Sequence, residues 1–138
     1  MEYTPTEYPF TVVYESEVES SNTAFLPRWY PIDDFFESVQ KSTFSISYPP
    51  DLGFKVKEEH FENRNITKLE LQNKIEYSIE NVLCEKPEEA SSTFKNVVPK
   101  VWFALEKFSL ESVEGSAKTW QDFGLWMGKS LLANTDEL

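Results

Sequence analysis

Alternation of apolar and polar side chains is the feature that most restricts the fold of this 138-residue chain. Five segments carry an apolar residue at every second position, which is the periodicity of a β-strand. The apolar sets are Phe10, Val12, Tyr14 and Val18; Phe44, Ile46 and Tyr48; Phe54 and Val56; Leu69 and Leu71; and Ile75, Tyr77 and Ile79. Clean alternation is typical of strands with one buried and one solvated face, so the pattern predicts antiparallel sheets.

The breaks between these segments contain residues that favour turns. "YPPDLG" at 48–53 holds two prolines, an aspartate and a glycine, while "NRN" (63–65) and "QNK" (72–74) are short enough for hairpin turns. We therefore expect residues 54–81 to form a three-stranded meander. Residues 100–111 are apolar on both faces, which predicts one further strand that is covered on both sides.

Two segments show no such periodicity. Pro27 and Pro31 exclude a regular element across residues 25–40, which we expect to form an ordered loop anchored by Trp29. Residues 85–99 are expected to be a long irregular connection.

Residues 119–132, "TWQDFGLWMGKSLL", are predicted to form a helix at the end of the chain. Thr119 is a favourable N-cap, and Asp122 three residues later completes a variant of the capping box. One helical stripe is expected to dock on the strands of this domain; it contains Trp120, Phe123, Met127 and Leu131. Other faces carry the candidate interaction surface: Leu125, Trp126 and Leu132. This surface is covered either by a partner or by long loops of the same chain.

Composition limits the classes of partner. Hydrophobic residues make up 40% of the chain and aromatic residues 15%, which is enough for a packed core. The net charge of −11 argues against nucleic acid or an anionic membrane as the main partner, because both require a basic face. The sequence contains no apolar run of transmembrane length and no visible signal peptide.

No residues are assigned to catalysis, to a cofactor or to a metal. Cys84 and His60 are the only pair that could act as nucleophile and base, and the acidic "EKPEE" after Cys84 favours a buried or half-buried structural thiol. Glu58 and His60 do not complete a zinc shell, and the spacing of Asp33, Asp34 and Glu37 matches no calcium loop. Three aromatic residues could either bind sugar or belong to the core: Trp29, Tyr30 and Trp102. Their spacing in the sequence does not distinguish these two roles.

The order of several segments resembles a known bacterial domain. These segments are "YPFTVVYE" (8–15), "LPRWY" (26–30), "STFSISYPPDLGFKV" (42–56), "PKVWF" (99–103) and "KTWQDFGLWMGKSL" (118–131). They are similar to the C-terminal part of the N-terminal β-sandwich domain, of unknown function, that precedes transglutaminase-like domains. The resemblance implies further strands before this chain, a periplasmic or extracellular location, and a catalytic Cys–His–Asp set after residue 138. His60 precedes Cys84 here, so no catalytic residue is carried over.

We therefore predict an all-β fold: an antiparallel β-sandwich-like domain, incomplete if the resemblance holds, with one C-terminal α-helix. Residues 1–116 would form the β domain, and residues 117–138 the helix and tail at a junction to a following domain. The predicted function is that of a non-catalytic accessory domain in a cell-envelope protein, with an adjacent transglutaminase-like, cysteine-protease-like domain as partner. A carbohydrate- or peptide-binding module is the alternative, and an open sheet edge would permit a homodimer.

Overall fold

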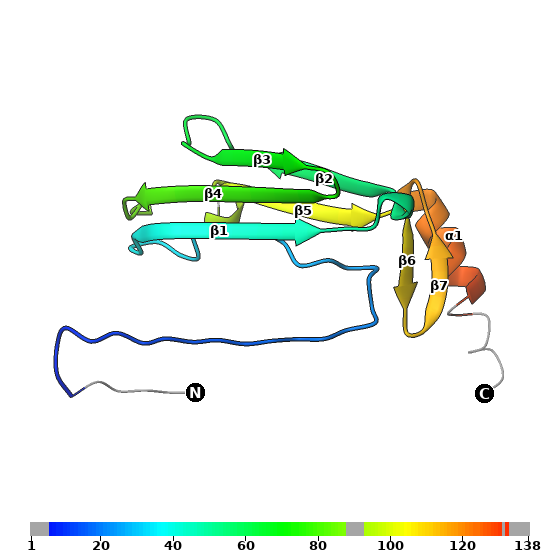
Figure 1. Ribbon diagram of the computed structural model, residues 1–138, viewed down its shortest axis with the longest axis horizontal. Coiled ribbons are helices and arrows are strands. Elements are labelled where there is room, and N and C mark those ends of the chain that lie inside the picture. Colours follow the sequence, from blue (N-terminus) through cyan, green and yellow to red (C-terminus); the bar gives the residue numbers. More distant parts are fainter. Residues whose placement is uncertain (1–5, 88–92, 131, 133–138) are drawn as a thin grey trace.

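The computed structural model describes residues 6–87, 93–130 and 132. Seven strands and one α-helix lie in this part of the chain (Figure 1). Their bounds are β1 Val39–Ser47, β2 Phe54–Glu59, β3 Thr67–Leu71, β4 Lys74–Val82, β5 Lys100–Leu105, β6 Lys107–Leu110, β7 Val113–Ser116 and α1 Trp120–Ser130. All strand pairs are antiparallel, which confirms the predicted all-β class with a single C-terminal helix.

Two of the three sheets pack face to face as a sandwich. The order in one sheet is β1-β4-β3, and the other sheet pairs β2 with β5. The alternating residues of β4 and β5 form the shared core, in which Ile75, Tyr77, Val101 and Phe103 are buried. Phe44 of β1 stacks on Phe103 across the two layers, with ring centroids 4.9 Å apart. The inward face predicted for β1 is therefore confirmed.

Trp29 anchors the loop at 25–40, as predicted. Its backbone exchanges two hydrogen bonds with Val101, at 3.1 and 3.0 Å, and so extends the edge of β5 by one bridge. Its buried ring stacks on Tyr77 at 5.5 Å, and its indole N–H donates to Ser42 Oγ at 3.1 Å. Trp29 thereby links the loop to both layers of the sandwich, through its backbone to β5 and through its side chain to β1 and β4.

A polar link joins the two layers on the side of β2 and β3. The Tyr77 hydroxyl donates to Glu58 Oε1 at 2.7 Å, and the Lys68 ammonium lies 2.9 Å from the same oxygen. Burial alone would raise the pKa of Glu58, but the hydrogen bonds from Tyr77 and Lys68 outweigh it and lower that pKa. Burial, followed by the hydrogen bond to Glu58, raises the pKa of Tyr77. The link therefore consists of a neutral phenol, a carboxylate and an ammonium.

The predicted meander over residues 54–81 is wrong in its pairing. β3 and β4 form the expected hairpin, with Asn73 at φ 61°, but β2 pairs with β5 in the other sheet. The link between β2 and β3 crosses from one layer to the other and contains His60 and Asn63 in left-handed conformations. β3 is exposed along its whole length, so its leucines do not face the core.

The single strand predicted over residues 100–111 is divided at Glu106. β5 ends at Leu105, and β6 pairs with β7 in a separate hairpin that stands across the direction of β5 (Figure 1). β7 was not expected from the sequence, because "VEGS" is short and has only one large apolar residue.

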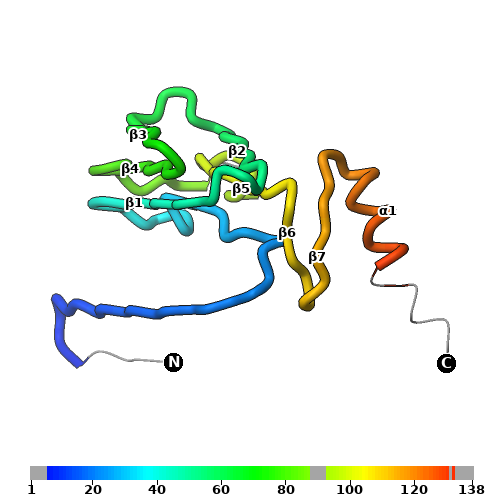
Figure 2. The backbone as a smooth tube through the Cα atoms, turned by 45° about the vertical axis from the view of Figure 1, so that its right-hand side comes forward, coloured from blue at the N-terminus to red at the C-terminus, as the bar shows by residue number. Residues whose placement is uncertain are grey.

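The segment that contains Phe10, Val12, Tyr14 and Val18 was predicted to be a strand, and this is wrong. Residues 6–22 form no strand in the described chain; the segment turns near its N-terminal end and then runs extended beside the sandwich (Figure 2). Separately, no helix within the described ranges is both long and apolar enough to cross a membrane.

Candidate interaction surface at the C-terminal helix

The start of α1 is fixed by the predicted capping box. Thr119 Oγ1 accepts a hydrogen bond from the Asp122 N–H at 3.2 Å, and Asp122 Oδ2 accepts one from the Thr119 N–H at 3.0 Å. The Asp122 carboxylate also accepts from the Lys118 N–H at 3.2 Å. Hydrogen bonds from the Thr119 side chain and backbone, in that order, hold the pKa of Asp122 below its ordinary value of 3.8.

We expect the cap to depend on pH in one direction. Because the pKa of Asp122 is lower in the folded state, its contribution is complete above pH 3.8 and is lost as the pH falls through the folded-state value. Asp122→Asn should therefore destabilise the chain at neutral pH, and the difference from the parent should vanish in acid. Urea unfolding at several pH values measures this, with Asp34→Asn at an exposed loop as the control. A difference that does not depend on pH would contradict the assignment.

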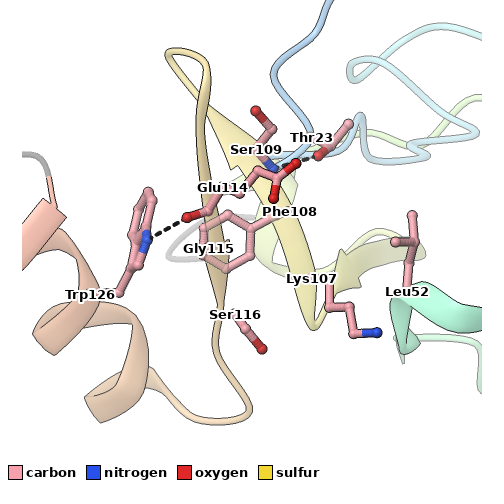
Figure 3. Close-up of a pocket in the computed structure, with 9 residues that line it drawn as sticks. All are labelled: Thr23, Leu52, Lys107, Phe108, Ser109, Glu114, Gly115, Ser116 and Trp126. Atoms are coloured by element: carbon pink, nitrogen blue, oxygen red, sulfur yellow. Dashed lines mark hydrogen bonds between the residues drawn. The ribbon is translucent and has the colours of Figure 1, made fainter.

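The helix docks on the β6–β7 hairpin through Phe123 and Trp126. The ring of Phe108 in β6 lies 5.4 Å from Phe123 and 4.9 Å from Trp126, edge to face in the second case. The Trp126 indole N–H points at the hairpin and donates to the Glu114 carbonyl at 3.0 Å (Figure 3). This group forms a small aromatic core outside the sandwich.

Gly115 makes this close docking possible. An added Cβ at Gly115 would lie 2.6 Å from ring atoms of both Phe108 and Trp126. Distances under 3 Å are not tolerated, so any larger residue would push the helix away from the hairpin.

The predicted docking stripe is wrong for Trp120, which is 80% exposed. Phe123 and Met127 are half-buried, and Leu131 lies outside the described residues. The helix rests on the β6–β7 hairpin and not on the face of the sandwich. The side of the helix that docks is therefore the one that carries Trp126. A helical wheel gives the angles between side chains but not the direction in which the support lies.

The side chains predicted as an interaction surface differ in their exposure. Leu125 is 63% and Leu132 55% exposed, whereas Trp126 is half-buried against the hairpin. Phe25, which sequence reasoning did not single out, is 67% exposed and lies 6.1 Å from Phe123. We call the exposed apolar side chains on and beside α1 the helix surface: Phe25, Trp120, Leu125 and Leu132.

A groove of about 660 Å³ opens between the N-terminal end of α1 and the outer face of β2 and β5. The apolar side chains that line it belong to the loop before β1, to β5 and to α1. The basic side chains belong to β2 and to the loop before β1. The principal lining residues are Phe25, Arg28, Lys55, Lys57, Glu59, Trp102, Trp120 and Phe123. The groove is therefore aromatic and locally basic in a chain that is acidic as a whole.

Ion pairs fix the charged residues of the groove floor. The Arg28 guanidinium lies 3.6 Å from the centre of the Trp102 ring, in a cation–π contact. Glu59 Oε1 lies 2.5 Å from Lys57 Nζ, and Glu59 Oε2 lies 3.1 Å from the buried Lys100 Nζ. Hydrogen bonds from Lys57, and then from Lys100, lower the pKa of Glu59 to about 2. Glu59 is therefore a carboxylate at neutral pH and is not suited to act as a general acid.

The remaining sequence candidates do not converge on one site. Cys84 is exposed, so the expectation of a buried or half-buried thiol is wrong. His60 and the acidic residues at 33, 34 and 37 are exposed. Within residues 6–87, 93–130 and 132, no group of three or more His, Cys, Asp or Glu is placed to hold a metal ion. Trp29 belongs to the core, Tyr30 is half-buried, and Trp102 lines the groove.

No protein-family model, curated protein sequence or solved structure matches the chain. The resemblance to a domain that precedes transglutaminase-like enzymes therefore stays a prediction. The function has to be inferred from the groove and from the helix surface.

Proposed function

We propose that the chain is a non-catalytic accessory domain of a bacterial transglutaminase-like protein and that α1 forms the contact with the neighbouring domain. The observation that supports this is the helix surface, where large apolar side chains at Phe25, Trp120 and Leu125 are more than half exposed. Several large exposed apolar groups on and beside one helix favour a contact surface. Under this proposal the parent protein acts in the cell envelope, in the periplasm or outside the cell, as the resemblance implies.

A comparison of residues 1–138 with the complete parental chain tests this contact. We expect Trp120 and Leu125 to react readily with hydroxyl radicals in the isolated chain and to be several-fold protected in the parental chain. Lys41, an exposed residue of β1, should react equally in both chains and serves as the control. Equal reactivity of Trp120 in both chains, or a reading frame that ends at Leu138, would overturn the proposal. Amine transfer or peptide cleavage by the isolated chain that disappears in Cys84→Ala would overturn its non-catalytic part.

A carbohydrate- or peptide-binding module is the second candidate, and the groove favours it. Its walls hold the exposed rings of Phe25 and Trp120, and Trp102 lies on its floor under Arg28. In that case a peptide or oligosaccharide would change the tryptophan fluorescence of the isolated chain, and Trp102→Ala would remove the response. An accessory domain that contacts only its neighbour would give no response.

A further inference from the structure

Residues 6–22 have the side-chain pattern of a strand but belong to no sheet of the described chain. Val12, Tyr14 and Val18 lie on one side of the pattern, while Glu15 and Glu17 lie on the other. Tyr14 is 84% and Val18 86% exposed, so the apolar side of the segment is not covered. An extended segment with exposed apolar side chains gains both hydrogen bonds and burial when it joins the edge of a sheet.

β2 provides an open edge whose charge fits this segment. Its only neighbour among the described strands is β5, so its other side is unpaired. Of the seven strands, β2 alone has lysines at two alternate positions, Lys55 and Lys57. Both are exposed, and each also forms an ion pair within the chain, with Glu106 and Glu59 respectively. Lysines protect an edge strand against most partners. That protection does not act against an acidic strand, and residues 6–22 contain four glutamates and no lysine or arginine.

We propose that the N-terminal segment of one copy adds to β2 of a second copy as an antiparallel edge strand. A register that sets Glu15 opposite Lys57 also sets Glu17 opposite Lys55, because both patterns repeat every two residues. Val18 then lies opposite Phe54 on the side of the core. Opposite charges that face one another across two strands stabilise the pair. The parallel arrangement that pairs the same charges would place Glu19 opposite Glu59, which is unfavourable.

We infer that the segment joins β2 of a second copy and not β2 of its own chain, because of the side of the sandwich along which it runs. Figures 1 and 2 both show β1 between this segment and the side of the sandwich that carries β2 and β3. The chain's own β2 therefore lies on the far side of the sandwich. Reciprocal addition between two copies closes into a two-fold dimer. This inference does not depend on the proposed accessory role, because it involves no other protein.

Two charge-reversed variants test the exchange in the full chain. Glu15→Lys/Glu17→Lys and Lys55→Glu/Lys57→Glu should each weaken self-association about 30-fold, because the two attractive cross-strand pairs at each of the two strand additions become repulsive. An equimolar mixture of the two variants should associate like the parent, since each donor strand then meets an edge of opposite charge. Sedimentation velocity at low ionic strength measures this, because salt screens exposed pairs.

The controls distinguish an effect of specific charges on association from a loss of the folded structure. Asp33→Lys/Glu37→Lys alters the net charge as much as the donor variant does, at exposed positions outside the segment, and should leave association unchanged. A variant that had merely lost its fold would not be rescued by mixing. A monomeric parent, or reversed variants that associate like the parent, would overturn the proposal.

Amide hydrogen exchange gives a second measurement on the unmodified chain. Protection of residues 14–18 and of β2 should rise together with protein concentration. Protection that does not change with concentration would mean pairing within one chain or none, and would overturn the exchange between copies.

Discussion

Replacing Trp29 with alanine is expected to lower the free energy of unfolding by about 3–5 kcal/mol, the usual penalty for emptying a buried tryptophan site. The indole fills the space between the loop at 25–40 and both layers of the sandwich, where it stacks on Tyr77 and donates to Ser42. The substitution leaves a cavity and removes the hydrogen bond to Ser42 Oγ.

Urea unfolding followed by far-ultraviolet circular dichroism measures this loss. Small domains are stable by only about 5–15 kcal/mol, so the alanine variant is expected to approach the limit of folding. Trp29→Phe keeps most of the ring and should remain measurable, with a smaller loss. Ser42→Ala removes only the hydrogen bond and should cost about 1 kcal/mol. A loss below that value for Trp29→Ala would show that this loop does not depend on its tryptophan.

The second largest effect is expected at Trp126. Trp126→Ala should cost about 2–3 kcal/mol, less than a fully buried tryptophan, because the ring is half-buried. The substitution removes the edge-to-face contact with Phe108 and the hydrogen bond to the Glu114 carbonyl. Trp120→Ala is the matched control on the same helix and should cost under about 1 kcal/mol, because its ring is mostly exposed.

Which of the two substitutions, Trp126→Ala or Trp120→Ala, costs more stability shows which side of α1 is docked. The helical pattern alone predicts the larger loss at Trp120, whereas the docking on β6 and β7 predicts it at Trp126. Equal losses, or a larger loss at Trp120, would mean that α1 is turned differently on its support. In the complete parental chain the cost of Trp120→Ala should increase if the neighbouring domain covers that ring.

Local signals in the sequence were sufficient for most elements of the fold. The alternation of Phe44 and Ile46 correctly gave the inward face of β1, and Thr119 with Asp122 correctly gave the start of α1. Trp29 was recognised as an anchor because two nearby prolines excluded any regular element around it. Each of these features depends on residues a few positions apart, which is the range over which a single sequence is informative.

The errors concern contacts between distant residues. Alternation shows that β2 has two different faces, but it does not show that β2 pairs with β5 instead of β3. The segment around Tyr14 has the same alternation, and yet it has no sheet to join within the described chain. For a related reason the helix surface was only partly predicted, and the groove was not predicted. Both depend on the β6–β7 hairpin and on Phe25, which lie far from α1 in the sequence.

The hydrogen bond of Trp126 ends on a main-chain carbonyl, and this affects how the hairpin can evolve. Every amino acid supplies that carbonyl, so the docking makes no demand on the side chain at position 114. The next position has the opposite property, because any side chain at Gly115 would collide with the two rings that hold the helix. Adjacent positions of one short hairpin are therefore under opposite selection: position 114 is free to drift, and position 115 is confined to glycine for as long as the helix stays docked.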